Sequence, residues 1–270
     1  MITTRGAFTG SMTLLLAIST VVSFVALGCK EDKPTAPDEK NTGKPGYGLI
    51  SDSCNLLWGV ECDSGTSLDK GYFVINHNDS WKIPYWVAYY LSDSNLVGNT
   101  ERIDEYRPDP ELPEEHRADN SDYSGSGYDR GHMAPAASFR RNREAMSLTF
   151  LLSNMCPQTS LLNRGRWRLL EDAVRDSVLS WGQAWIFTGV IFMDDDSNWI
   201  EPLKHIGDSV AVPTHCFKAV LLMTDDSLFL PLAYLMPNTS DSIPGKVEDC
   251  CIEIEKLEVL TGWTFFGETP

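Results

Sequence analysis

The sequence predicts an α+β fold built on a mainly antiparallel sheet. Short apolar runs rich in valine, isoleucine and aromatic residues outnumber the expected helices and do not alternate regularly with them. That order favours an antiparallel sheet with separate helices over a parallel α/β sheet. The chain has 270 residues, and 42% of them are hydrophobic, which is enough for a substantial core in one or two domains.

The predicted strands are, in chain order, residues 72–75, 86–91, 149–153, 184–192, 216–223 and 228–235. A polar, proline-rich stretch over residues 104–120 predicts a long loop. Two helices are expected, one over residues 163–179 with Gly182 just beyond it, and one over residues 247–260 before Gly262.

The first of these helices has a polar stripe and an apolar face. The stripe is about 60° wide at 100° per residue and consists of Arg164, Arg168, Glu171 and Arg175. The apolar face, which we expect in the core, consists of Trp167, Leu170 and Val174. Asn163 stands at the expected start, where asparagine is a favoured cap. One helix can thus present Asn163, Glu171 and Arg175 together, although Glu171 and Arg175 could also form a plain i,i+4 salt bridge.

Charge is unevenly distributed along the chain. The formal net charge of −16 argues against a bulk binder of nucleic acid, because polyanion binding relies on neutralising phosphates. Residues 129–175, however, contain eight arginines and four acidic residues, so this window carries +4 and the rest of the chain −20. We expect an acidic body with one cationic region.

The chemistry-bearing residues fall in that same window. Asp129-Arg130-Gly131-His132 comes first, a block at residues 153–158 follows, and the helix from Asn163 completes the set. Histidine is the natural base near neutral pH. A hard divalent cation prefers oxygen ligands such as the asparagine amide, and guanidinium groups bind phosphate oxygens. Together these groups are suited to hydrolysing phosphodiester bonds.

In this order and spacing the blocks resemble those of the DNA/RNA non-specific endonucleases. That family includes secreted bacterial nucleases and relatives of mitochondrial endonuclease G, and it carries a ββα-metal (His-Me finger) site. The resemblance covers about residues 71–266. It implies a metal-dependent hydrolase that cuts DNA and RNA without sequence preference, binds them through the phosphate backbone and leaves 5′ phosphates.

The resemblance also implies a role for each matching residue. His132 is the expected general base, and Asn163 is the expected ligand of Mg²⁺, or of Mn²⁺ or another divalent cation. Glu171 matches a residue that orients metal-bound water, and Arg175 matches an arginine beside the scissile phosphate. Arg102 matches an arginine that stabilises the transition state, with Arg107 as the alternative.

Further residues are expected to support the site or to contact the substrate. Asp129 is expected to anchor the turn before His132, and Gly131 to allow a close approach of the backbone. The candidates for substrate binding are Asn154, Gln158, Arg130 and Arg168. Of these, Asn154 and Gln158 are expected to act by shaping the cleft.

Two other functions remain open on the residues alone. One is a surface lipoprotein that binds nucleic acid without cutting it, and the other is a phosphodiesterase acting on small nucleotides. No recognition helix of a sequence-specific DNA binder is evident, and no feature indicates a protein partner.

The N-terminus has the pattern of an export signal. Arg5 precedes an apolar run over residues 12–27, and Gly28-Cys29 follows it as in a bacterial lipobox. We expect a signal peptide over residues 1–28, a lipidated Cys29 with a flexible tether to residue 47, and an endonuclease domain over residues 48–270. The protein is then an outer-membrane or cell-surface lipoprotein, or otherwise periplasmic or secreted.

The remaining cysteines and histidines carry no expected chemistry. Cys54 and Cys62 are the first candidates for a disulfide, since an exported protein can form one. Cys156 is not expected to be a catalytic thiol. His205 and His215 are expected to be structural.

Overall fold

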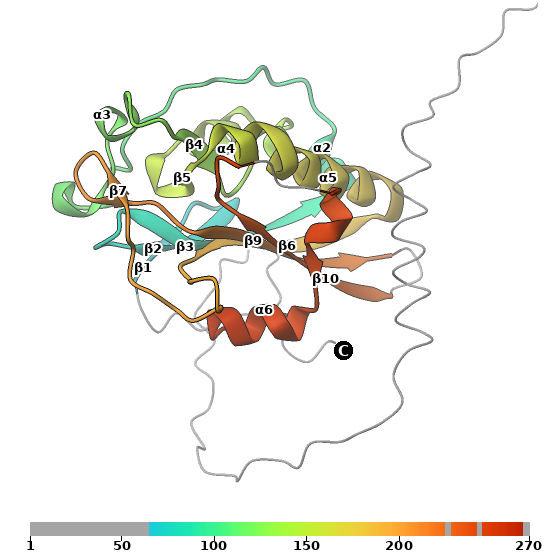
Figure 1. Ribbon diagram of the computed structural model, residues 1–270. Coiled ribbons are helices and arrows are strands. Elements are labelled where there is room, and N and C mark those ends of the chain that lie inside the picture. Colours follow the sequence, from blue (N-terminus) through green and yellow to red (C-terminus); the bar gives the residue numbers. More distant parts are fainter. Residues whose placement is uncertain (1–64, 225–227, 242–244, 267–270) are drawn as a thin grey trace, which may run out of the picture. The chain divides into compact units, whose positions relative to one another are not determined.

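The central feature of the fold is a seven-stranded sheet, seen in a computed structural model that describes residues 65–224, 228–241 and 245–266 (Figure 1). Its strands are β1 Thr66–Asp69, β2 Phe73–Asn78, β3 Ile83–Ser92, β6 Gln183–Ile191, β9 His215–Met223, β10 Phe229–Pro237 and β11 Cys251–Ile252. They lie in the order β1-β2-β3-β6-β9-β10-β11, and each neighbouring pair is antiparallel. The predicted α+β class is confirmed.

Both faces of this sheet are covered. Helix α5 (Arg168–Trp181) lies over one face, and helix α6 (Ile254–Thr261) lies against the other (Figure 1). Successive side chains of a strand point to opposite faces, so Ile186 joins the core under α5 while Phe187 joins the core over α6. Strands buried on both faces read as continuous apolar runs, which is why the central strands were predictable.

A second, two-stranded sheet lies on the α5 side. Its strands are β4 (Asp129–His132) and β5 (Met155–Gln158), which pair antiparallel so that Gly131 faces Cys156 and His132 faces Met155. The Asp-Arg-Gly-His segment is therefore a strand and not the turn expected from the sequence. A third small sheet pairs β7 (His205–Ile206) with β8 (Val210–Ala211).

Two predicted elements are wrong. Residues 149–153 form no strand, because the chain turns after α4 (Arg143–Leu148) and passes into the 3-10 turn η3 (Leu152–Asn154). The expected helix over 247–260 is divided into the 3-10 turn η5 (Val247–Cys250), strand β11 and α6. Here the edge strand β11 pairs with β10, and this pairing competes with helix formation and interrupts it.

The predicted helix over 163–179 begins earlier than expected and is bent. Thr159 caps it, since its Oγ1 accepts a hydrogen bond from the Leu162 N–H at 3.3 Å. The π-helical turn η4 (Leu162–Trp167) comes before α5, and Gly165 within η4 has non-helical angles of φ −101° and ψ −107°. Asn163 therefore lies within the first turn and is not the cap. The apolar face is confirmed, because Trp167, Leu170 and Val174 are all buried.

The other described helical segments are short, namely α2 Asp93–Leu96, η1 Glu114–His116, α3 Asn120–Tyr123 and η2 Ala136–Phe139. The loop expected over residues 104–120 is confirmed, with η1 as its one complete helical turn among the described residues. Within the described ranges, no helix has both the length and the apolar character needed to span a membrane.

Candidate active site

His132 ends strand β4 and is buried among aromatic rings. Its ring lies edge-on to Phe150 at 5.0 Å and to Tyr106 at 5.8 Å, measured between ring centroids. Its Nε2 atom has no hydrogen-bond partner among the described residues. Burial, reinforced by the nearby cation of Arg102, lowers the pKa of His132 to about 3. The imidazole is therefore neutral at neutral pH, and its buried Nε2 atom is left without a hydrogen bond to any described group.

Of the two candidate arginines, Arg102 lies beside His132. Its guanidinium carbon stands 5.1 Å from the centroid of the Phe150 ring, which His132 also contacts. Arg107 instead donates to the Ser147 carbonyl at 3.0 Å and to the Ser147 hydroxyl at 3.2 Å. Arg107 thus braces the backbone, and Arg102 is the arginine placed to act with His132.

Asp129 accepts hydrogen bonds from several side chains at the N-terminal end of the bent helix. Its carboxylate accepts hydrogen bonds from the Asn163 Nδ2 at 3.0 Å, from Arg164 Nε at 2.8 Å and from the Ser160 hydroxyl at 3.2 Å. Burial alone would raise the pKa of Asp129, but the hydrogen bonds from Arg164 and Asn163 outweigh burial and lower it. An ionised carboxylate only accepts hydrogen bonds, so the Asn163 amide must turn its nitrogen toward Asp129 and its oxygen away.

Helix α5 supplies Glu171 and Arg175, which do not form the simple salt bridge considered above. Arg175 donates to Asp172, which also accepts a hydrogen bond from Arg168 at 3.1 Å. The Arg175 Nη1 is buried without a partner among the described residues. Burial raises the pKa of the Glu171 carboxyl, against the opposing effect of the Lys218 and Arg175 cations. Arg168 itself is exposed on the outer surface of the helix.

Asn154 and Gln158 lie behind the site, with both side chains fully buried. Asn154 accepts a hydrogen bond from the Ala134 N–H and donates to the carbonyls of Ala134 and Thr149, at 2.9–3.0 Å. Gln158 fills the space above Gly131, where an added Cβ would come within 2.3 Å of the Gln158 side chain. Such burial is incompatible with direct binding of a substrate from solvent, so both residues support the strand that carries His132.

Arg130 is held between two aromatic rings. Its guanidinium carbon lies 5.1 Å from the Tyr106 ring centroid and 5.2 Å from that of Tyr123. It also donates to the Asn120 carbonyl at 3.0 Å. These contacts fix the segment before β4, while the buried Nε remains without a partner among the described residues.

The available ligands suit a hard cation that keeps most of its bound waters better than one that is surrounded by protein ligands. The described part of the chain contains no cluster of three or more His, Cys, Asp or Glu side chains that could hold a metal ion. The Asn163 oxygen, turned away from Asp129, is a ligand of the type that Mg²⁺ accepts while keeping several waters. The residues present therefore fit a divalent cation bound through one amide oxygen and water.

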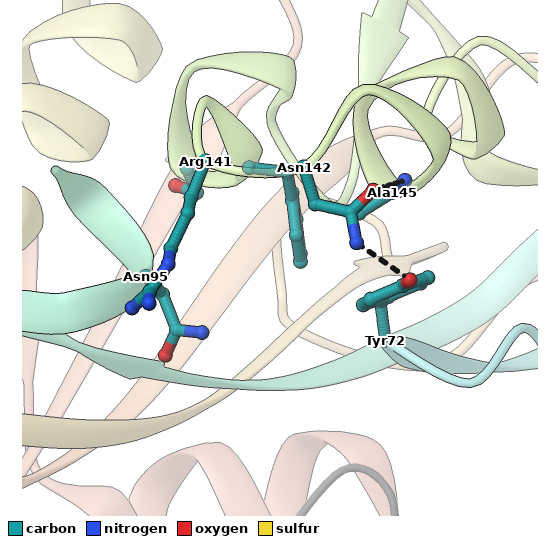
Figure 2. Close-up of a pocket in the computed structure, with 7 residues that line it drawn as sticks. Tyr72, Asn95, Arg141, Asn142 and Ala145 are labelled. Carbon is teal, nitrogen blue, oxygen red and sulfur yellow. Dashed lines mark hydrogen bonds between the residues drawn. The ribbon is translucent and has the colours of Figure 1, made fainter. Parts of the chain in front are cut away.

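A pocket of about 320 Å³ lies elsewhere on the α5 side of the sheet. It is lined by Tyr72, Asn95, Ser138, Phe139, Arg141, Asn142 and Ala145. Figure 2 shows the Asn142 amide pointing to the Tyr72 hydroxyl, with which it forms a 2.7 Å hydrogen bond, and Arg141 and Asn95 on the other side. None of the expected site residues contributes to this lining.

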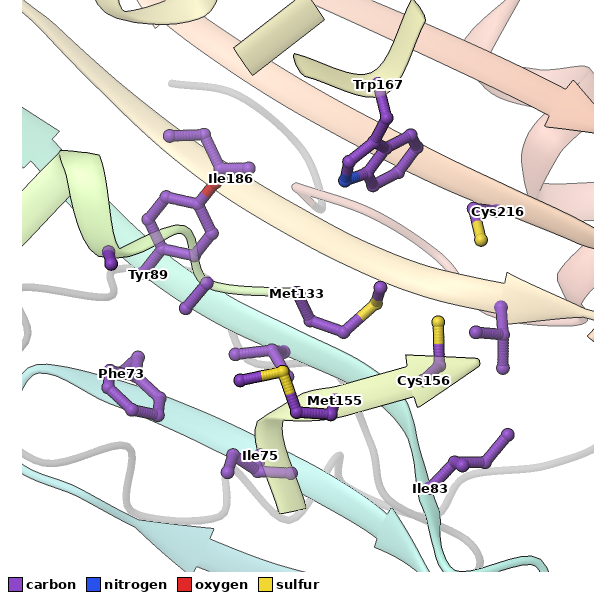
Figure 3. Close-up of a cluster of buried hydrophobic side chains, with 14 of the residues drawn as sticks. Phe73, Ile75, Ile83, Tyr89, Met133, Met155, Cys156, Trp167, Ile186 and Cys216 are labelled. Carbon is purple, nitrogen blue, oxygen red and sulfur yellow. The ribbon is translucent and has the colours of Figure 1, made fainter. Parts of the chain in front are cut away.

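Cys156 is unsuited to nucleophilic chemistry. It is fully buried on β5, and burial together with the neighbouring Cys216 thiol raises its pKa. Figure 3 shows the two sulfur atoms pointing toward one another within the core. Both are free thiols. The candidate pair Cys54–Cys62, like the expected signal peptide, Cys29 and tether, lies outside the described residues.

One buried charge near the site was not anticipated from the sequence. Lys218 is fully buried on β9 and electrostatically coupled to Glu171 and Arg175. It stands in the apolar run over residues 216–223. A single lysine within a strand predicted to be buried was the sequence feature that could have indicated it.

Comparison with known proteins places the chain in a family. A family model of DNA/RNA non-specific endonucleases matches residues 59–270. The mitochondrial nuclease EXOG of Danio rerio is 35% identical over 201 residues, which are 72% of this chain and 58% of that protein. Nuclease C1 of Cunninghamella echinulata var. echinulata is 32% identical over 216 residues, covering 76% of this chain and 86% of that nuclease.

A solved structure gives the same result at the level of the fold. The crystal structure of the EndoG/EndoGI complex superposes with a TM-score of 0.71 and 29% identity, over 77% of this chain and 88% of that chain. Against the EXOG proteins the chain spans little more than half their length, 58% in Danio rerio and 54% in Homo sapiens. The family model nevertheless matches most of the chain, which therefore belongs to the DNA/RNA non-specific endonuclease family.

Proposed function

We propose that the protein is a metal-dependent endonuclease that hydrolyses phosphodiester bonds of both DNA and RNA. Its family membership supports this, and so do relatives named nuclease C1 and endonuclease G. The observation that carries the proposal is the state of His132, a neutral imidazole with an unpartnered Nε2 beside the cation of Arg102. A phosphodiesterase needs a base that is unprotonated at neutral pH next to a group that binds phosphate.

The chain's own groups divide the work of the reaction. A ring nitrogen of His132 accepts a proton from the water that attacks phosphorus, which neutral imidazole can do without first losing a proton. Arg102 and Arg175 bind the non-bridging phosphate oxygens, and the buried Arg175 Nη1 has no other hydrogen-bond partner among the described residues. Asn154 and Gln158 hold β4 and so keep His132 in place.

Asn163 would hold the divalent cation through its amide oxygen, with Asp129 fixing the amide in that orientation. Glu171 would accept hydrogen bonds from the water bound to the cation. When bound, Mg²⁺ or a similar cation would neutralise charge on the phosphate and on the leaving 3′ oxygen. The expected products carry a 5′ phosphate.

The N-terminal organisation is proposed from the sequence alone. Residues 1–28 act as a signal peptide, Cys29 carries the lipid, residues 30–47 form a tether, and the endonuclease domain occupies 48–270. The protein would then be an exported lipoprotein of the outer membrane or the cell surface. Expression of the Cys29→Ser variant tests this, because the nuclease should move from the membrane fraction to the soluble exported fraction. Retention of Cys29→Ser in the membrane fraction would refute the lipid anchor.

The function is tested with supercoiled plasmid and single-stranded RNA, each incubated with Mg²⁺ and with EDTA. We expect metal-dependent loss of both substrates, abolished in His132→Ala and unaffected in His205→Ala, whose exposed histidine on β7 lies outside the site. A dinucleotide substrate forms a third arm. Turnover of the dinucleotide with intact polymers would indicate a small-nucleotide phosphodiesterase, and binding of polymers without any cleavage would indicate a nucleic-acid receptor.

A further inference from the structure

Lys218 differs from the other buried lysines of the described chain in having no ion pair. Lys70 lies within 2.8 Å of Asp109 and 2.9 Å of Glu111, and Lys82 lies within 3.0 Å of Asp208. Lys218 is fully buried, and no described carboxylate lies within 4.0 Å of its Nζ. Burying an ammonium group is unfavourable unless the charge is compensated. The position therefore calls for a reason beyond packing.

Neutral groups hold the ammonium in place. Its Nζ donates to the Thr188 hydroxyl on β6 at 2.5 Å and to the Tyr89 hydroxyl on β3 at 3.4 Å. It also lies 4.8 Å from the centroid of the Trp167 ring and 5.8 Å from that of Tyr89. Hydroxyls and ring faces stabilise a cation but do not cancel its charge, so the positive field extends into the surroundings.

The carboxylate that this field reaches is Glu171, on the helix packed over the sheet. The groups that interact electrostatically with Lys218 are Glu171, Arg175 and Cys216. Those that interact with Glu171 are Lys218, Arg175, Asp172 and Arg102, and Glu171 also acts on Tyr89. Burial raises the pKa of Glu171 and lowers that of Lys218, while the attraction between the two charges opposes both shifts.

We propose that Lys218 is a positioning residue that keeps the Glu171 side chain charged and directed into the active site. This inference rests on the proposed function, in which Glu171 accepts hydrogen bonds from water bound to the cation. It adds that a residue of the sheet beneath α5 keeps Glu171 in the state needed for that role. Thr188 and Tyr89 serve it by holding the ammonium under the helix. Their hydroxyls cannot neutralise Lys218 as a second carboxylate would.

The coupling can be measured without any nuclease assay. A carboxyl whose native pKa is raised loses stabilisation as the pH rises through that native value, because the native state then holds its proton longer than the unfolded state. In Lys218→Met the native pKa of Glu171 rises further. In wild type the decline in stability ends near the native Glu171 pKa of about 7. We therefore expect the decline in Lys218→Met, measured by urea unfolding, to continue above pH 7. In a Glu171→Gln background, where no carboxyl titrates at this position, Lys218→Met should not produce this decline.

The reciprocal variant keeps the test decisive if Lys218→Met does not fold. A lysine whose native pKa is depressed makes stability rise with pH above that native value, because the unfolded state still binds the proton. Removing the carboxylate in Glu171→Gln depresses the native pKa of Lys218 further. Stability should then begin to rise at lower pH than in wild type. Glu111→Gln, beside the ion-paired Lys70, is the matched control. It should leave unchanged the pH at which stability begins to rise.

Activity gives the second measurement. The acid limb of kcat/KM on plasmid DNA should move up by about one pH unit in Lys218→Met, as expected when a carboxylate loses a nearby cation. Lys218→Arg should restore most of the wild-type profile. Lys70→Met removes an equally buried lysine and its ion pairs, so it should lower stability without moving the limb.

The outcomes separate the two proposals. Additive pH effects of Lys218→Met and Glu171→Gln on stability, with an unmoved acid limb, would overturn the role of Lys218. If wild type cleaves no substrate, the proposed function fails, and the unfolding cycle still decides whether Lys218 and Glu171 are coupled.

Discussion

The Asn163 amide nitrogen donates a 3.0 Å hydrogen bond to Asp129, three residues before His132 on strand β4. This single contact links the strand that carries the expected base to the helix turn that carries the expected metal ligand. It also fixes the amide orientation, because an ionised carboxylate accepts hydrogen bonds and does not donate them.

Replacing Asp129 should therefore weaken metal binding before it weakens chemistry. In Asp129→Asn the partner of Asn163 can both donate and accept, so the amide is free to reverse. We expect the Mg²⁺ concentration for half-maximal cleavage to rise by about 10- to 100-fold, as for other residues that orient a metal ligand. Ser160→Ala removes a different hydrogen bond to Asp129 and is the control. An equal rise in both variants would contradict the assignment.

Gly131→Ala should disturb the site through Gln158. The added Cβ would lie 2.3 Å from a side chain that is fully buried and cannot move into solvent. We expect a loss of about 1–3 kcal/mol in the free energy of unfolding, typical of an overpacked core. Combining it with Gln158→Ala should recover part of that loss. If the two losses simply add in urea unfolding, the steric explanation is wrong.

Alanine variants of Arg102 and Arg107 should have different effects, one mainly on activity and the other mainly on stability. Arg102→Ala removes a cation next to His132 and should lower kcat/KM by about 100-fold or more, with little change in unfolding. Arg107→Ala removes hydrogen bonds to Ser147 and should lower the free energy of unfolding by about 1–3 kcal/mol. Thermal melts and plasmid cleavage on both variants distinguish the roles, and an exchange of phenotypes would restore Arg107 as the candidate.

The burial of His132 predicts a dependence of stability on pH. In the unfolded chain the imidazole takes a proton near pH 6.5, at about the ordinary histidine pKa. In the native state its pKa is lowered to about 3. Below about pH 6.5 the unfolded state therefore binds more protons, and stability falls as the pH falls. His132→Asn should flatten this decline in urea unfolding between pH 6.5 and 4, whereas His205→Ala, at an exposed histidine, should not.

The sequence predicts those parts of the fold in which local pattern and burial agree. Strands β6 and β9 are covered on both faces, so their apolar runs are unambiguous. Strand β4 is missed because it consists of polar residues and glycine, and its pairing with β5 depends on contacts distant in sequence. The run over 149–153 misleads because a short apolar segment can be a buried turn as well as a strand.

The candidate site follows the same rule. Motif order identifies which residues matter, but geometry is needed to say what each one does. The sequence predicts Asn163 as the helix cap, yet Thr159 is the cap, because the π-helical turn shifts the start. The sequence predicts that Asn154 and Gln158 shape the cleft, and their burial adds that they do so by supporting β4. Lys218 belongs to no motif, since the groups around its ammonium, on β3 and β6, are brought to it only by packing.

Strand β4 is joined to β5 through only four residue pairs and forms no ladder with the seven-stranded sheet, whose β6 and β9 share nine. Local opening of such a short ladder requires less free energy than opening the central sheet. Backbone amides of β4 and β5 should consequently exchange with deuterium well before those of β6 and β9. Addition of Mg²⁺ and a non-cleavable oligonucleotide should slow exchange chiefly in this ladder. The strand that carries His132 can then lose its order while the fold persists.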